Sequence, residues 1–203
     1  MNDIPPIRRR QLLSLSVGLL WLVAVVAGLG SVLSYEATQG TAEQAPPSWP
    51  RDTELSLNDR GATLVMFAHP RCPCTRASLG ELDKTIARCQ DNVKACVVFL
   101  KPTGASGDWD QTDLWKAARA IPGVQVLQDR DGKEAQRFHA TTSGQTLLYN
   151  RESALVFNGG ITMARGHFGD NPGRDSIESY LTTGSPVRNQ TPVYGCPIVK
   201  NPN

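Results

Sequence analysis

The feature that most constrains the fold is the alternation, after residue 60, of uninterrupted apolar runs with amphipathic segments. Ala62–Ala68 and Ala95–Leu100 contain no charged residue, which is typical of strands buried on both faces of a sheet. Between them, Arg76–Cys89 repeats its apolar side chains at helical spacing. Because alternating strands and helices favour a parallel sheet covered by helices, the sequence predicts an α/β domain.

The same alternation continues almost to the end of the chain. It predicts further helices over Asp110–Ile121, Lys133–Phe138 and Arg174–Leu181, and strands over Val124–Leu127, Thr146–Tyr149 and Ala154–Phe157. Asn150–Ser153, between the last two strands, indicates a hairpin. The predicted order is therefore β-α-β-α-β-α-β-β-α, with a mixed sheet because the hairpin adds antiparallel strands to a parallel core.

A second constraint is the 25-residue run without charge between Arg10 and Glu36. Its Leu-, Val-, Ala- and Gly-rich part is long enough, as a helix, to span the roughly 30 Å hydrocarbon core of a membrane. The three arginines at positions 8–10 favour a cytoplasmic N-terminus. A cleaved signal peptide is the alternative, but its apolar region is normally about 7–15 residues long. We therefore predict an uncleaved signal-anchor.

These features divide the chain into a cytoplasmic tail (1–11), a transmembrane anchor (12–34), a polar linker (35–50) and a domain (51–203) with a Pro/Gly-rich C-terminal tail. We expect a single-pass protein of the cell inner membrane whose domain is extracytoplasmic, in the periplasm. The arginines at positions 8–10, set against Asp3, account for the whole net charge of +2. The domain is therefore neutral overall, which gives no case for nucleic acid as a partner.

The chemistry-bearing motif is Cys72-Pro73-Cys74, at the junction of the first predicted strand and the first predicted helix. A helix N-terminus favours the thiolate form of cysteine, and Arg71 adds a neighbouring positive charge. Cys72 is the predicted nucleophile and Cys74 the predicted resolving thiol. Residues two apart have Cα atoms at most about 7 Å apart, so a bent backbone allows a disulfide. Strain in so small a ring predicts an oxidising potential.

The other three cysteines leave alternatives open. Five cysteines in an exported domain is an odd number, so at least one is unpaired, reactive or metal-bound. Cys89 and Cys96 either form a structural disulfide or remain two buried thiols. Cys196 lies between Gly195 and Pro197 in the tail, where it resolves a disulfide with Cys72 or Cys74, supplies a third sulfur ligand, or stays inert.

The element order, with cysteines at the first strand–helix junction, resembles the thioredoxin fold. It is most similar to membrane-anchored extracytoplasmic thioredoxin-like proteins of the TlpA and ResA type, and also to a small thioredoxin-like group labelled RedB. The resemblance covers about residues 55–183 and is carried by Phe67–Arg76, Asp129–Phe138 and Ser143–Leu148. It implies a thioredoxin-like mixed central sheet flanked by helices, and thiol–disulfide exchange with exported proteins.

The sequence departs from this group at four positions, of which two are Arg71, where the resemblance expects a tryptophan, and Cys74, where it expects no cysteine. Thr75 stands where the resemblance expects the second cysteine, and Gln145 stands where it expects a cis-proline. A cis bond before Gln145 would cost about 2.5–4 kcal/mol, so we expect a trans bond. In the thioredoxin fold, the loop after the terminal hairpin flanks the active cysteines. The resemblance therefore brings Arg165 and His167 toward the site, with His167 as a base, a ligand or a surface residue.

Two functions remain after this reading, besides a scaffold whose cysteines serve only stability. The first is a thiol–disulfide oxidoreductase that needs no cofactor and takes thiols or disulfides of exported proteins as partners. The alternative is a module for copper or another soft metal, similar to the thioredoxin-like Sco proteins. Its donors would be Cys72 and Cys74 with an imidazole from His69 or His167, a set that suits Cu(I) or Zn. A peroxiredoxin is disfavoured because Ala77 stands where its motif requires cysteine.

Overall fold

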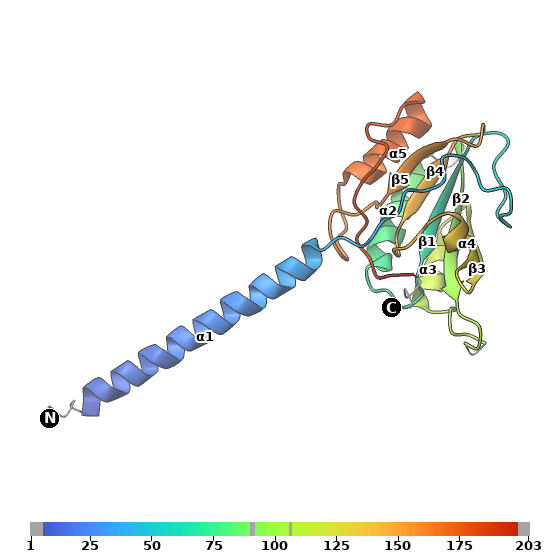
Figure 1. Cartoon of the computed structure of the whole chain (residues 1–203). Coiled ribbons are helices and arrows are strands. Elements are labelled where there is room, and N and C mark those ends of the chain that lie inside the picture. Colours follow the sequence, from blue (N-terminus) through green and yellow to red (C-terminus); the bar gives the residue numbers. More distant parts are fainter. Residues whose placement is uncertain (1–5, 90–91, 106, 199–203) are drawn as a thin grey trace. The chain divides into compact units, whose positions relative to one another are not determined.

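The computed structural model describes residues 6–89, 92–105 and 107–198. The chain separates into two compact units, residues 1–37 and 38–203 (Figure 1). The first unit is the single helix α1 (Pro6–Ala37), and the second is an α/β domain whose elements follow the predicted order. The predicted tail 1–11 lies partly outside the described residues, because these begin at residue 6.

The domain is built on one five-stranded sheet with the order β3-β2-β1-β4-β5. β1 pairs in parallel with β2, and β2 with β3, whereas β4 runs antiparallel to both β1 and β5. The strands are β1 (Ala62–Ala68), β2 (Val93–Lys101), β3 (Val124–Arg130), β4 (Thr146–Tyr149) and β5 (Leu155–Gly159). The predicted mixed sheet and its C-terminal hairpin are therefore confirmed.

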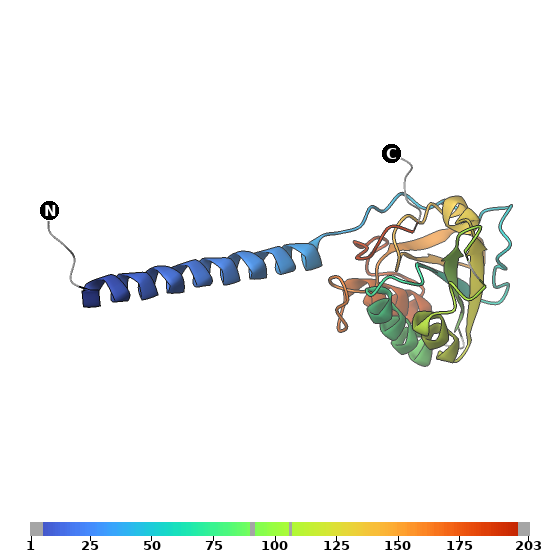
Figure 2. The same ribbon diagram turned by 90° about the horizontal axis from the view of Figure 1, so that it is seen from below.

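Helices cover both faces of this sheet, as Figure 2 shows. One face packs against α2 (Thr75–Cys89), α3 (Asp113–Ala120) and α5 (Pro172–Thr183), and the other against α4 (Lys133–Arg137). Successive residues of a strand point to opposite faces, so β2 contributes alternately to two separate cores. The predicted fold class, a thioredoxin-like mixed central sheet flanked by helices and preceded by an apolar helix, is confirmed.

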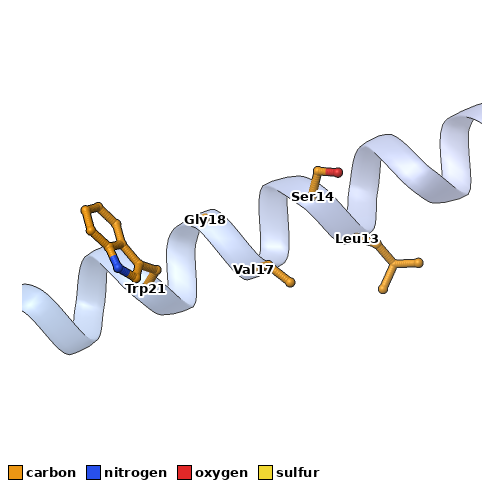
Figure 3. Close-up of a pocket in the computed structure, with 5 residues that line it drawn as sticks. All are labelled: Leu13, Ser14, Val17, Gly18 and Trp21. Carbon is orange, nitrogen blue, oxygen red and sulfur yellow. The ribbon is translucent and has the colours of Figure 1, made fainter.

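Helix α1 is longer than the predicted anchor at both ends. Its segment Arg10–Ala37 is long and apolar enough, by length and composition, to cross a membrane. Its large apolar side chains from Leu12 to Tyr35 are exposed. Figure 3 shows a shallow hollow on this surface, where Gly18 has no side chain between Trp21 and the pair Leu13 and Ser14.

The structure differs from the prediction in the segment before the domain, because residues 38–50 are packed rather than free. The indole ring of Trp49 lies 5.1 Å from the ring of Phe138 and 5.2 Å from that of Tyr149, between centroids. The amide of Leu155 donates to the carbonyl oxygen of Pro47 at 2.9 Å. β5 is an edge strand of the sheet. Pro47 of this segment pairs with the start of β5, and Asn189 pairs with Asn158 further along the strand. Trp49 is partly buried against the core on the α4 face, which composition alone did not reveal.

Candidate active site

Cys72 and Cys74 lie in the turn that leads from the end of β1 into α2. The amide of Cys72 donates to the carbonyl oxygen of His69, and the amide of Thr75 donates to that of Cys72, both at 3.1 Å. The amide of Ala77 in turn donates to the carbonyl oxygen of Cys74 at 3.1 Å. Cys72 is therefore held beside the N-terminus of a 15-residue helix, where backbone N–H groups favour negative charge.

The sulfur of Cys72 is a hydrogen-bond acceptor in a fully covered site. Its residue is 0% exposed, and the backbone amide of Cys196 donates to its Sγ at 3.4 Å. Burial raises the pKa of Cys72, but hydrogen bonds from the thiol and amide of Cys196 and from the hydroxyl of Thr75 outweigh it, so the pKa lies below its ordinary value. The site thus favours a thiolate at this position.

The two neighbouring thiols are shifted in the opposite direction. Burial, the charge of Cys72 and a hydrogen bond to it raise the pKa of Cys74, against an opposing effect of Arg165. Burial and a hydrogen bond to Cys72 raise the pKa of Cys196 to about 12. Of the three thiols, Cys72 is therefore the one that loses its proton most readily.

The loop before β4 lies beside the turn that carries Cys72, and its residue Ser143 hydrogen-bonds to that turn. The hydroxyl of Ser143 accepts from the amide of His69 and shares a hydrogen bond with the hydroxyl of Thr75, both at 2.8 Å. The sequence did not single out Ser143, although it lies in a segment that carried the resemblance. Thr75, in the place of a second cysteine, thus connects Ser143 to the nucleophile.

Gln145 supports this loop through two side-chain hydrogen bonds. Its side-chain oxygen accepts from the amide of Thr141 at 3.1 Å, and its side-chain nitrogen donates to the side-chain oxygen of Asn158 at 2.9 Å. No cis peptide bond occurs within the described ranges 6–89, 92–105 and 107–198. The predicted trans bond before Gln145 is therefore confirmed.

The loop after β5 contributes Arg165, as the resemblance implied. Its guanidinium donates to the carbonyl oxygen of Gly195 at 2.7 Å and to that of Thr38 at 3.0 Å, and it also contacts the thiol of Cys74. His167 lies on the same loop with an exposed side chain. The loop is tied to α2 because the amide of Gly169 donates to the buried carboxylate of Glu81 at 3.0 Å.

His69 and Arg71 both face an aromatic residue that the sequence analysis missed. The imidazole of His69 meets the ring of Trp109 edge-on at 5.6 Å, and the guanidinium of Arg71 lies 4.8 Å above the same ring. Burial, followed by the charge of Arg71, lowers the pKa of His69. Trp109 lies 36 positions beyond Pro73 with no motif around it, so no local signal connected it to the site.

The donor set expected for a soft metal is not assembled. Within the part of the chain that the structure describes, no group of three or more His, Cys, Asp or Glu side chains is placed to hold a metal ion. The imidazole of His69 is instead engaged with Trp109. The set Cys72, Cys74, His69 and His167 therefore lacks support from the geometry.

A surface hollow of about 330 Å³ opens beside the nucleophile. Its wall on one side is the turn before α2, including Arg71 and Cys72, and on the other the start of α3 with Asp113. Arg76 and Asp113 form an ion pair at its rim.

The predicted structural disulfide between Cys89 and Cys96 is not formed. All five cysteines lie within the described ranges, and each is a free thiol. Cys89 belongs to the core beneath α2, whereas Cys96 belongs to the core on the opposite face of the sheet. The sheet therefore separates the two sulfurs, and the alternative of two buried thiols describes them.

Comparison with known proteins finds structures with a similar fold but shows no family. No protein-family model matches the chain, and no curated protein matches it. A hypothetical protein from Sinorhizobium meliloti 1021 is similar in structure, with a TM-score of 0.64 and 22% identity, over 82% of this chain and all of that one. An uncharacterized conserved protein from Geobacillus kaustophilus has a TM-score of 0.57 and 20% identity, over 83% of this chain and 96% of that one.

A third solved structure is the exposed lipoprotein thioredoxin of Streptococcus pneumoniae strain TIGR4. It has a TM-score of 0.42 and 19% identity, over 61% of this chain and 84% of that one. All three identities lie below 25%. The first two likenesses therefore describe the fold alone, and the chemistry has to be argued from the site.

Proposed function

We propose that this protein is a membrane-anchored, extracytoplasmic thiol–disulfide oxidoreductase with Cys72 as its nucleophile. The observation that carries the proposal is the sulfur of Cys72, which accepts hydrogen bonds from Cys196 and Thr75 beside the N-terminus of α2. Such donors stabilise a thiolate, which is the form that attacks disulfides. Cys72 has two further thiols in contact, so a dithiol can be oxidised within the same site.

The reaction begins when the Cys72 thiolate attacks one sulfur of a partner's disulfide. The partner's S–S bond breaks, one partner sulfur leaves as a thiolate, and the other stays bound to Cys72 as a mixed disulfide. A second thiol of the protein then attacks Sγ of Cys72 and releases the partner's second thiolate. The partner gains two electrons and the protein dithiol becomes a disulfide. In the opposite direction the oxidised protein delivers its disulfide to a partner dithiol.

The proposal also includes where the protein is located and which group of proteins it resembles. α1 would anchor the chain in the cell inner membrane. Its arginine-rich N-terminal end would lie in the cytoplasm, and the domain would lie in the periplasm. Exported proteins are the partners expected there, because disulfides persist in that compartment. The protein would then stand beside the TlpA, ResA and RedB types of anchored thioredoxin-like proteins.

The test uses the full-length chain in detergent. Reduced protein is mixed with a small aromatic disulfide whose released thiolate absorbs light. The Cys72→Ser variant is expected to lose the fast phase of release, whereas Cys89→Ala, which removes a thiol from the core, keeps it. Equal rates of thiolate release by Cys72→Ser and the unmodified chain would contradict the proposal.

A further inference from the structure

The last described part of the chain, Thr191–Ile198, lies against the loop before β4; we call it the C-terminal segment. Thr142 and Pro197 form an antiparallel β-bridge. The amide of Ser143 donates to the carbonyl oxygen of Cys196 at 2.8 Å, and the amide of Ile198 donates to that of Thr141 at 2.9 Å. An extended peptide is thus paired, backbone to backbone, with the edge of the loop next to the nucleophile.

This pairing is close and well anchored. A Cβ atom on Gly195 would lie 1.9 Å from the carbonyl oxygen of Ser143, so only glycine allows this approach. The carbonyl oxygen of Gly195 accepts from Arg165 at 2.7 Å. Downstream, the side chain of Ile198 is 3% exposed and enters the core on the α4 face of the sheet. The C-terminal segment is therefore built into the domain.

The segment also covers the nucleophile. Cys72 is 0% exposed, and the Cys196 amide touches its sulfur from a position 124 residues further along the chain. A disulfide-containing partner has to reach that sulfur with its own backbone nearby. The backbone groups at the loop edge beside this sulfur, the amide of Ser143 and the carbonyl oxygen of Thr141, are already paired with the segment.

From these contacts we propose that the C-terminal segment is a built-in, substrate-like occupant of the peptide-binding edge at Thr141–Ser143, and that Cys196 is the resolving thiol of Cys72. This proposal rests on the proposed function. A partner that carries a disulfide in an extended segment displaces residues 191–198 and binds by the same backbone pairing. When the segment returns, it brings Cys196 back to Cys72.

The chemical step is balanced without a further reactant. Attack by the Cys72 thiolate gives a mixed disulfide and one partner thiolate. Cys196 gives its proton to the first partner thiolate, and the Cys196 thiolate attacks Sγ of Cys72. The bond between Cys72 and the partner breaks, the Cys72–Cys196 bond forms, and the second partner thiolate leaves. The partner disulfide is reduced by two electrons, and the two protein thiols are oxidised.

Cys74 is less suited to this step than Cys196. Its carbonyl oxygen accepts from the amides of Ala77 at 3.1 Å and Ser78 at 3.5 Å, so it is fixed in the first turn leading into α2. A bridge to Cys72 would have to bend that turn, because the two residues are only two apart. Cys196 is on a separate segment, which can approach Cys72 without a change in α2.

The first experiment identifies the resolving thiol. Reduced full-length chain in detergent is treated with oxidised glutathione, quenched with acid, alkylated and mapped by mass spectrometry. The unmodified chain and Cys74→Ala are expected to end with a Cys72–Cys196 disulfide. Cys196→Ala is expected to accumulate glutathione on Cys72, at roughly tenfold the level of the unmodified chain, because the mixed disulfide is no longer resolved.

Two results would overturn the assignment of Cys196. One is a Cys72–Cys74 disulfide in the unmodified chain, and the other is a Cys196→Ala variant that resolves glutathione as fast as the unmodified chain does. If Cys72 takes up no glutathione in any variant, the proposed function itself fails and this proposal falls with it. That outcome is distinct from the first two.

The second experiment tests occupancy of the peptide-binding edge. Gly195→Ala forces the segment away from Ser143, whereas Gly107→Ala is the matched control, because a Cβ there meets nothing within 4 Å. Alkylation of Cys72 by iodoacetamide at fixed pH is expected to be about tenfold faster in Gly195→Ala, which corresponds to about 1.4 kcal/mol of easier opening. Equal rates in the two variants would show that the segment does not gate access to Cys72.

Discussion

Cys72 and Cys96 are both almost completely covered by protein, yet the structure shifts their acidities in opposite directions. Cys96 has apolar neighbours on the α4 face of the sheet, and burial raises its pKa to about 12. Cys72 has donors around its sulfur, and its pKa is lowered despite its burial. Burial by itself therefore makes a thiol unreactive. Hydrogen bonds from N–H, O–H and S–H groups to the sulfur make a buried thiol reactive.

The largest effect is expected in the pH dependence of alkylation of the two thiols in the folded domain. The thiolate of Cys72 is half-formed below pH 9 because its pKa is lowered, whereas that of Cys96 is half-formed only near pH 12. We expect Cys72 to react at least about 10³-fold faster than Cys96 at pH 7. Mass mapping of the labelled thiols over a pH series measures both. Similar profiles for the two cysteines would contradict the contrast.

A smaller effect is expected when one donor to Cys72 is removed. Thr75→Val deletes the hydroxyl that donates to the sulfur, so the pKa of Cys72 rises and its reactivity at pH 7 falls. One hydrogen bond to a charged group is worth about 1.5–3 kcal/mol, which predicts a decrease of about tenfold or more. Thr75→Ser restores the hydroxyl and is expected to restore the rate. A Ser variant as slow as the Val variant would show that the methyl group, and not the hydroxyl, matters.

A still smaller effect is expected from Arg165, which contacts the second thiol. Its guanidinium opposes the raised pKa of Cys74, so Arg165→Met is expected to move the alkylation profile of Cys74 to higher pH. The change at pH 8 is about two- to fivefold, because the group is partly exposed and screened by solvent. Arg188→Met is the control, because Arg188 is exposed and its amide donates to the hydroxyl of Ser176 in α5. An unchanged Cys74 profile in Arg165→Met would exclude this electrostatic role.

The smallest effect belongs to the core thiols themselves. Cys89→Ala removes one buried sulfur from the core beneath α2. It is expected to lower the free energy of unfolding by about 1–2 kcal/mol, with no change in the rate at which the protein reduces a small disulfide. Denaturant titration and the aromatic-disulfide assay measure the two quantities. A loss of disulfide reduction in a folded Cys89→Ala variant would show that the core thiol takes part in exchange.

Most of the secondary structure was predictable because it is encoded in local periodicity. β1 and β4 have the predicted bounds, and the helices agree to within a few residues. The face on which Cys96 lies was not predictable, because a strand that is apolar throughout carries no alternation to read. The packing of residues 38–50 was missed for a related reason, since a polar, Pro-rich segment can cover an edge strand without any periodic pattern.

The sequence by itself determined the order of strands and helices, the apolar N-terminal helix, and the position of Cys72 at the start of α2. Those features depend on residues close together in the chain. The tertiary structure decided which thiols meet. It placed Cys196 against Cys72 across 124 residues and separated Cys89 from Cys96 by a sheet. Such contacts arise from backbone pairing and side-chain packing between distant segments, so no local pattern records them.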